Sequence, residues 1–147
     1  MKISHMIRVA ALLGIGAVAL TGCSTLTEQL QNERSSEFQS TTDLQERWDK
    51  TAPWLPADAT QIRTHESTEG DPAILSATTD AELDSSQCAE TPRQSAPAFA
   101  QPWSPKDKDV FVDAAFACGD WTVIAIPGGW YGWTPNDPDE KAVSPAQ

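Results

Sequence analysis

The sequence predicts a small α+β domain: a mostly antiparallel sheet of four or five strands, one or two short helices and one disulfide. Residues 109–118 alternate between apolar and polar positions, which is typical of a half-buried strand. Residues 121–126 and 130–134 form two further strand-like runs with a Pro-Gly-Gly turn between them. Cys88 and Cys118 supply the candidate disulfide.

The run over residues 109–118 predicts one apolar face. Its apolar positions are Val110, Val112, Ala114, Phe116 and Cys118, with Asp109 and Asp113 on the opposite face. The run over residues 121–126 is apolar enough to be a central strand, and residues 130–134 return beside it.

An earlier hairpin is predicted over residues 60–65 and 73–78, because Glu69-Gly70-Asp71-Pro72 between them is rich in turn residues. In its first strand Ile62 points one way, whereas Arg63 and His65 point the other. We therefore expect His65 to lie on an exposed polar face.

Two short helices are predicted. Thr42-Asp43-Leu44-Gln45 resembles a capping box and opens a helix over residues 43–51, which Pro53 limits. Leu44 and Trp48 share one face of it at i and i+4 and should pack on the domain. A second helix is expected over residues 80–87, with Leu83 facing inward.

The segment Thr91–Lys108 contains four prolines and is expected to be an ordered, irregular loop. Phe99 and Trp103 are candidates to pin it to the core. Long loops without secondary structure are often functional, so a binding role for the two aromatic rings stays open.

The chain begins with an export signal. Lys2 and Arg8 precede the uncharged run Val9–Leu20, which is about 12 residues long and therefore shorter than the roughly 20 that span a membrane. Leu20-Thr21-Gly22-Cys23 follows it directly. This stretch resembles the lipobox of bacterial lipoproteins, in which an aliphatic residue and two small residues precede the cysteine to be modified.

The resemblance implies that Cys23 receives a diacylglycerol on its sulfur, that the chain is cleaved after Gly22, and that the new amine is acylated, for example with palmitate. Two or more acyl chains anchor a protein stably. The expected location is the extracytoplasmic face of the cell membrane. The mature composition, rich in Ala, Pro, Thr and Asp, also resembles that of short envelope lipoproteins of high-GC Gram-positive bacteria.

Once Cys23 is assigned to the lipid, Cys88 and Cys118 remain, and an exported chain favours a disulfide between them. The rival interpretation is a metal or redox pair. The spacing is far from C-x-x-C, and His65 is the only histidine after the signal.

Four regions follow from these features: a removed signal peptide (1–22), a lipidated polar tether (23–40), the α+β domain (41–135) and a disordered tail (136–147). Loss of Lys2 and Arg8 changes the formal charge from −11 to −13. That charge argues against nucleic-acid binding and against lying on an anionic membrane surface.

No catalytic motif is present, and we expect no catalytic residue, cofactor or metal. There is no G-x-S-x-G, H-E-x-x-H or P-loop sequence, and nothing singles out a pair of carboxylates among the 21 acidic residues. Asp107-x-Asp109 and Asp137-x-Asp139 lack the glycine and distal Glu of a calcium loop.

The remaining candidate site is aromatic. Tyr131 and Trp133 share one face of the last strand and Trp130 takes the other. Exposed rings there would stack on sugars or act as interface anchors; alternatively, they close the ends of a small core. The expected function is a membrane-anchored envelope binding module with a protein or cell-wall glycan partner. The alternatives are a small cell-wall hydrolase or hydrolase inhibitor, and a passive structural lipoprotein.

Overall fold

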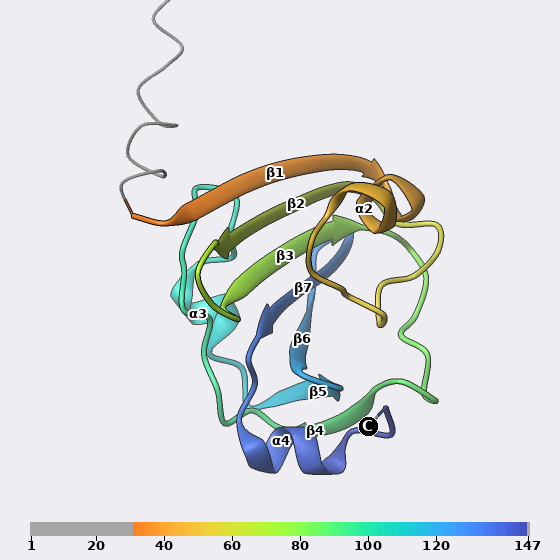
Figure 1. Ribbon diagram of the computed structural model, residues 1–147. Coiled ribbons are helices and arrows are strands. Elements are labelled where there is room, and N and C mark those ends of the chain that lie inside the picture. Colours follow the sequence, from red (N-terminus) through yellow and green to blue (C-terminus); the bar gives the residue numbers. More distant parts are fainter. Residues whose placement is uncertain (1–30, 147) are drawn as a thin grey trace, which may run out of the picture.

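A computed structural model describes residues 31–146 and contains one seven-stranded sheet (Figure 1). The strands are β1 (Glu33–Ser40), β2 (Thr60–Ser67), β3 (Ala73–Thr78), β4 (Ala89–Pro92), β5 (Ala114–Cys118), β6 (Trp121–Ile126) and β7 (Gly129–Thr134). The short helices are α2 (Thr41–Arg47), α3 (Asp107–Val110) and α4 (Pro138–Val143). The predicted α+β class, antiparallel sheet and disulfide are confirmed, whereas the sheet has more strands than the four or five expected.

The sheet is built from two meanders. Its order is β1-β2-β3-β7-β6-β5-β4, and every neighbouring pair is antiparallel. After β3 the chain crosses to the far edge at β4 and works back until β7 pairs with β3. Figure 1 shows the resulting sheet curving from β1 at the top to β4 at the bottom. The predicted hairpin is β2–β3, β6 is an interior strand as expected, and β7 returns beside it.

Residues 33–40 form edge strand β1, although the sequence placed them in the tether. Phe38 is buried in the core, and the other β1 residues are partly or fully exposed. Edge strands commonly carry charged and polar side chains, which discourage pairing with another chain, and β1 carries Glu33, Arg34 and Glu37. The polar sequence therefore carried almost no strand signal.

Helix α2 begins two residues earlier than predicted. The Ser40 side chain, not Thr42, accepts a hydrogen bond from the Asp43 amide and caps the helix. The helix ends at Arg47, because Trp48 is already extended. Leu44 and Trp48 are both buried, as expected from their shared face.

The helix expected over residues 80–87 does not form. Asp84 accepts hydrogen bonds from both the backbone amide and the hydroxyl of Ser86, and its carbonyl accepts from the amides of Gln87 and Cys88. Short polar side chains of this kind compete with helical hydrogen bonds. Leu83 is nevertheless packed against the core, as expected.

The strand expected over residues 109–118 is divided. Its first part belongs to α3, and only Ala114–Cys118 is strand β5. Both faces of β5 are covered, since Ala115 packs in one core cluster and Cys118 in the other. The alternating pattern therefore reflected a helical turn followed by a short strand.

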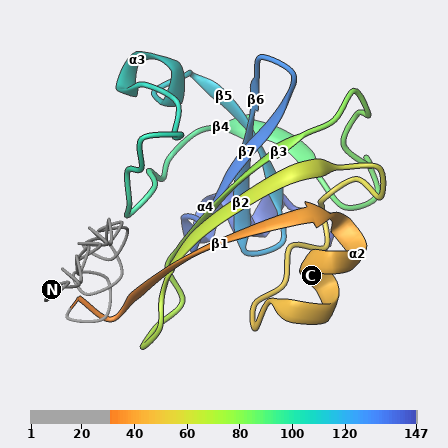
Figure 2. The ribbon, with the colours of Figure 1, turned by 90° about the horizontal axis from the view of Figure 1, so that it is seen from above.

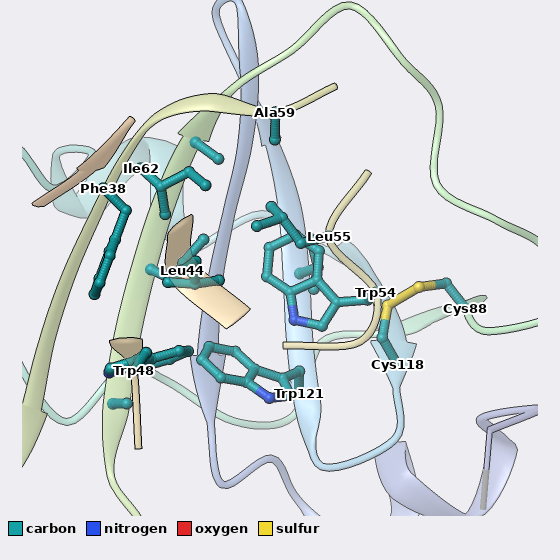
Figure 3. Close-up of a cluster of buried hydrophobic side chains, with 14 residues drawn as sticks. Phe38, Leu44, Trp48, Trp54, Leu55, Ala59, Ile62, Cys88, Cys118 and Trp121 are labelled. Carbon is teal, nitrogen blue, oxygen red and sulfur yellow. A yellow bond between two sulfur atoms is a disulfide. The ribbon is translucent and has the colours of Figure 1, made fainter. Parts of the chain in front are cut away.

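The sheet has a hydrophobic core on each side. The helix-side core packs under α2 and contains the buried residues Phe38, Leu44, Trp48, Trp54, Leu55, Ala59, Ile62, Ala73, Leu75, Ala77, Cys88, Cys118, Trp121 and Val123 (Figure 3). The loop-side core packs under α3 and contains Ile74, Val110, Ala115, Ile124, Tyr131 and Trp133. Figure 2 shows α2 and α3 on opposite sides of strands β1–β3.

Helix α4 lies in the region expected to be a disordered tail. Asp137 and Glu140 form a capping box at its start. Glu140 is fully buried and accepts hydrogen bonds from the amides of Gln94 and Ser95 and from the hydroxyl of Thr122. This one carboxylate therefore ties the C-terminal helix to the sheet and to the start of the proline-rich loop.

Candidate binding surface

The aromatic face expected on β7 is largely covered. Tyr131 and Trp133 are 0% and 1% exposed, because β7 lies between β3 and β6 with a core on each side. Trp130 is half-buried, packs edge-on against Phe116 at 5.7 Å, and donates its indole N–H to the Ala81 carbonyl at 2.9 Å. The three rings therefore do not form an exposed binding face.

Gly132, between these rings, is required by close packing. A Cβ atom there would lie 2.7 Å from the ring of Trp54. The Trp54 and Trp121 rings also pack at 5.8 Å, so the strand and the segment after α2 approach closely at this point. Gly132 thus serves the helix-side core.

The structure tests the predictions for two of the three cysteines. Cys88 and Cys118 are bonded to each other, as expected. They are buried at the margin of the helix-side core, where the Cys118 end of β5 lies beside the start of β4 (Figure 3). Cys23, the predicted lipidation site, lies outside the described residues.

His65 is buried, so the expectation of an exposed histidine is wrong. The loop covers the β2 face that looked polar, and the Phe99 ring packs edge-on against the imidazole at 4.9 Å. Its Nε2 lies 3.0 Å from a Glu33 carboxylate oxygen, and its Nδ1 lies 2.8 Å from the Ser35 hydroxyl. This serine–histidine–carboxylate line joins β1 to β2.

Two Asp-x-Asp fragments were considered as cation sites. One has a structural role, and the other is exposed. Asp137 accepts a hydrogen bond from the Asp139 amide at the start of α4. Asp107 and Asp109 are exposed in the single turn of α3. Over residues 31–146, no group of three or more histidine, cysteine or acidic side chains could hold a metal ion.

The proline-rich loop borders a mostly apolar hollow. This loop hollow has a volume of about 470 Å³ and lies between the loop, α3 and the β6–β7 turn. It is lined by Trp103, Pro105, Lys108, Asp109, Val112, Ala125, Ile126 and Pro127. Trp103 is half-buried, and its ring packs against Tyr131 at 6.4 Å. Phe99 and Trp103 thus pin the loop as expected, and Trp103 also lines its hollow.

A second hollow, polar and about 330 Å³, opens at the opposite strand ends beside the β5–β6 turn. Its charged groups are largely engaged. The Lys50 ammonium donates to the Gly70 carbonyl at 2.6 Å, and Asp120 pairs with Lys141. We therefore regard the loop hollow as the better candidate, since an apolar hollow gains more from being filled.

Phe111 adds an exposed ring next to α3. It is 56% exposed, and the guanidinium of Arg93 lies 5.0 Å from its ring centroid. Phe111 does not line the loop hollow but a neighbouring hollow of about 180 Å³, with Phe99 and Tyr131. Sequence reasoning missed it, because the expected strand placed Phe111 on the same face as two aspartates, Asp109 and Asp113.

Comparison of the chain with protein-family models, with curated proteins and with solved structures finds no match. In the part of the chain that the structure describes, no helix is both long and apolar enough to cross a membrane.

Proposed function

We propose that this protein is a lipid-anchored protein of the bacterial envelope and that its domain is a binding module. The lipobox-like stretch ending at Cys23 supports the anchor and a location on the extracytoplasmic face of the membrane. The Cys88–Cys118 disulfide fits an oxidising compartment outside the cytoplasm.

The observation that carries the binding role is the loop hollow. Its lining is mostly apolar, from Trp103, Val112, Ile126 and two prolines, and only Lys108 and Asp109 bring charge to it. Such a site suits an apolar side chain of another envelope protein, with a polar group pairing at the rim. A cell-wall glycan is the less favoured partner, because sugar hydroxyls need more hydrogen-bonding groups than this lining offers.

A photo-crosslinking experiment tests the binding role. A photoreactive residue replaces Ala125, which lines the loop hollow, or Ala142, which is exposed on α4 as a matched control. We expect illumination of intact cells to give a discrete protein adduct from position 125 and none from position 142. Adducts from neither position, or equal adducts from both, would favour the passive structural lipoprotein.

The anchor is tested separately with Cys23→Ala. The wild-type protein should incorporate labelled palmitate and sediment with membranes, and the variant should do neither. A variant that stays membrane-bound would contradict the proposed anchor.

A small cell-wall hydrolase is a second candidate with one observation in its favour. The Ser35 hydroxyl, the His65 imidazole and the Glu33 carboxylate are joined by contacts of 2.8 and 3.0 Å, an arrangement that can activate a serine. None of the hollows described above is lined by Ser35, and the imidazole is buried beneath Phe99. A fluorophosphonate probe, which labels activated serines, tests this candidate. We expect no labelling of the wild-type protein. Labelling that is lost in Ser35→Ala would establish the hydrolase.

A further inference from the structure

Phe111 lies at the end of α3 beside Arg93, and we define the Phe111 patch as Phe111 with Arg93, Lys106 and Lys108. Among the described residues, Phe111 and Val143 are the two large apolar side chains exposed at the surface, at 56% and 49%. Arg93 holds its position beside the Phe111 ring through hydrogen bonds to the carbonyls of Val112 and Ser95. The exposed aromatic ring therefore lies beside a half-buried cation whose position is fixed.

The charge of the patch differs from that of the whole chain. The mature chain carries a formal charge of −13 and only eight Lys and Arg residues, three of which are in the patch. Asp107, Asp109 and Asp113 bring the local balance close to neutral. This surface is consequently repelled less by phospholipid headgroups than the rest of the domain.

The patch also lies near the point where the chain leaves for the proposed anchor. Glu33, the first residue of β1, contacts His65, and His65 packs on Phe99, which lines one hollow together with Phe111. Figure 1 shows the start of β1 on the same side of the molecule as α3. Nine residues, Ser24 to Asn32, separate Cys23 from β1 and reach at most about 30 Å when extended.

We propose that the Phe111 patch is a second membrane contact: the Phe111 ring enters the interface of the bilayer that holds the lipid on Cys23, and the three cations face lipid phosphates. This proposal rests on the proposed anchor. One aromatic ring binds a bilayer too weakly to hold a free protein, but a short lipidated tether makes the contact intramolecular. The contact orients the domain on the membrane.

A domain held on the membrane by the Phe111 patch leaves the loop hollow accessible to a partner. Phe111 lines the hollow beside Phe99, and of the patch residues only Lys108 also lines the loop hollow, at its rim. The loop hollow also opens at the β6–β7 turn, and β1 starts at the opposite end of the strands. A partner could thus enter it while Phe111 touches lipid.

Spin labelling of the full-length lipidated protein in phosphatidylcholine vesicles tests the contact. A nitroxide is attached at Lys106→Cys in the patch or at Ala142→Cys on α4. We expect the label at 106 to be several-fold less accessible to a water-soluble nickel chelate and more accessible to oxygen, which concentrates in lipid. The label at 142 should show the aqueous pattern.

Phe111→Ser and Val143→Ser form the matched pair, because each removes one exposed apolar side chain. Introduced into the Lys106→Cys protein, Phe111→Ser should restore the aqueous pattern at 106, and Val143→Ser should leave it unchanged. Retention of the lipid pattern in Phe111→Ser would overturn the assignment to that ring.

Vesicle flotation separates failure of the contact from failure of the anchor. If the protein floats but the label at 106 is aqueous, the contact is wrong and the anchor stands. If that label is shielded from both the chelate and oxygen, a second copy of the protein covers the patch and the lipid contact is wrong. If the protein does not float, both the anchor and the contact are wrong.

Discussion

The two sides of the sheet are covered in different ways. On the helix side, three tryptophans pack against one another, with Trp121 at 6.1 Å from Trp48 and 5.8 Å from Trp54. On the loop side, an irregular proline-rich segment with one helical turn covers the core and leaves Trp103 half-buried beside the loop hollow. We therefore predict that the helix side provides most of the stability, and we propose that the loop side provides the surface for binding.

Trp121→Ala should have the largest effect on the helix side. It removes two ring contacts and the hydrogen bond from the indole N–H to the Thr51 carbonyl. We expect the free energy of unfolding to fall by about 3–5 kcal/mol in a urea titration. A loss below about 1 kcal/mol would mean that the helix side is not the main source of stability.

Opening the disulfide should have the next largest effect. The bond closes a loop with a sequence separation of 30, which corresponds to about 3–4 kcal/mol in the chain-entropy model. We expect the paired replacement of Cys88 and Cys118 by serine to lower stability by that amount in the same titration. Reduction of the wild-type protein should reproduce the loss, and agreement between the two would exclude a side effect of the serines.

Glu140→Gln tests the link between α4 and the loop side. Burial alone would raise the pKa of Glu140, but hydrogen bonds from Ser95, the Gln94 amide, Thr122 and the Asp137 amide outweigh it and lower the pKa. A carboxyl with a lowered folded-state pKa contributes stability above its unfolded-state pKa and loses that contribution as the pH falls through the folded-state pKa.

We therefore expect Glu140→Gln to lower the free energy of unfolding by about 1–3 kcal/mol at neutral pH. The difference from wild type should shrink in acid, when the wild-type carboxyl is protonated as well. Urea titrations at pH 7 and pH 3 measure both values. An unchanged difference at the two pH values would contradict the role assigned to the ionised carboxylate.

Trp103→Ala should have the smallest effect on stability and the largest effect on binding. Because the ring is half-buried, we expect a loss of about 1–2 kcal/mol, less than for Trp121→Ala. It should also abolish the crosslink from position 125. If Trp103→Ala destabilised the domain as much as Trp121→Ala and left the crosslink intact, the two sides would have the opposite roles.

Local patterns identified the elements in which neighbouring residues decide the structure. The β2–β3 hairpin, β6 and β7 were predictable because apolar runs flank strong turn residues. The disulfide was predictable because only two cysteines follow the lipobox-like stretch. Leu44 and Trp48 were correctly expected to be buried, since they share a helix face.

Elements that depend on distant contacts were missed. Strand β1 is polar because it lies at an edge, and its place is set by pairing with β2. Helix α4 depends on Glu140, whose partners come from residues 94, 95 and 122 as well as from its own capping box. His65 was assigned to solvent because the loop that buries it follows more than 30 residues later.

The candidate site was predictable only in part. The prolines correctly indicated an irregular loop, and Phe99 and Trp103 were expected to pin it. The tryptophans of β7 were chosen as the candidate binding face instead of this loop. Composition shows how many aromatic rings the chain has, but it does not show which of them are covered. Phe111 was hidden in an alternating pattern that was in fact a helical turn.

The disulfide also encloses most of the segment that covers the loop side. Cys88 precedes β4 and Cys118 ends β5, so residues 89–117, with the proline-rich loop and α3, form a covalent ring. A protease that cuts any bond within this ring would leave one connected molecule still attached to its N-terminal segment. A nicked protein would migrate as a single band on a denaturing gel without reductant and as two fragments with it.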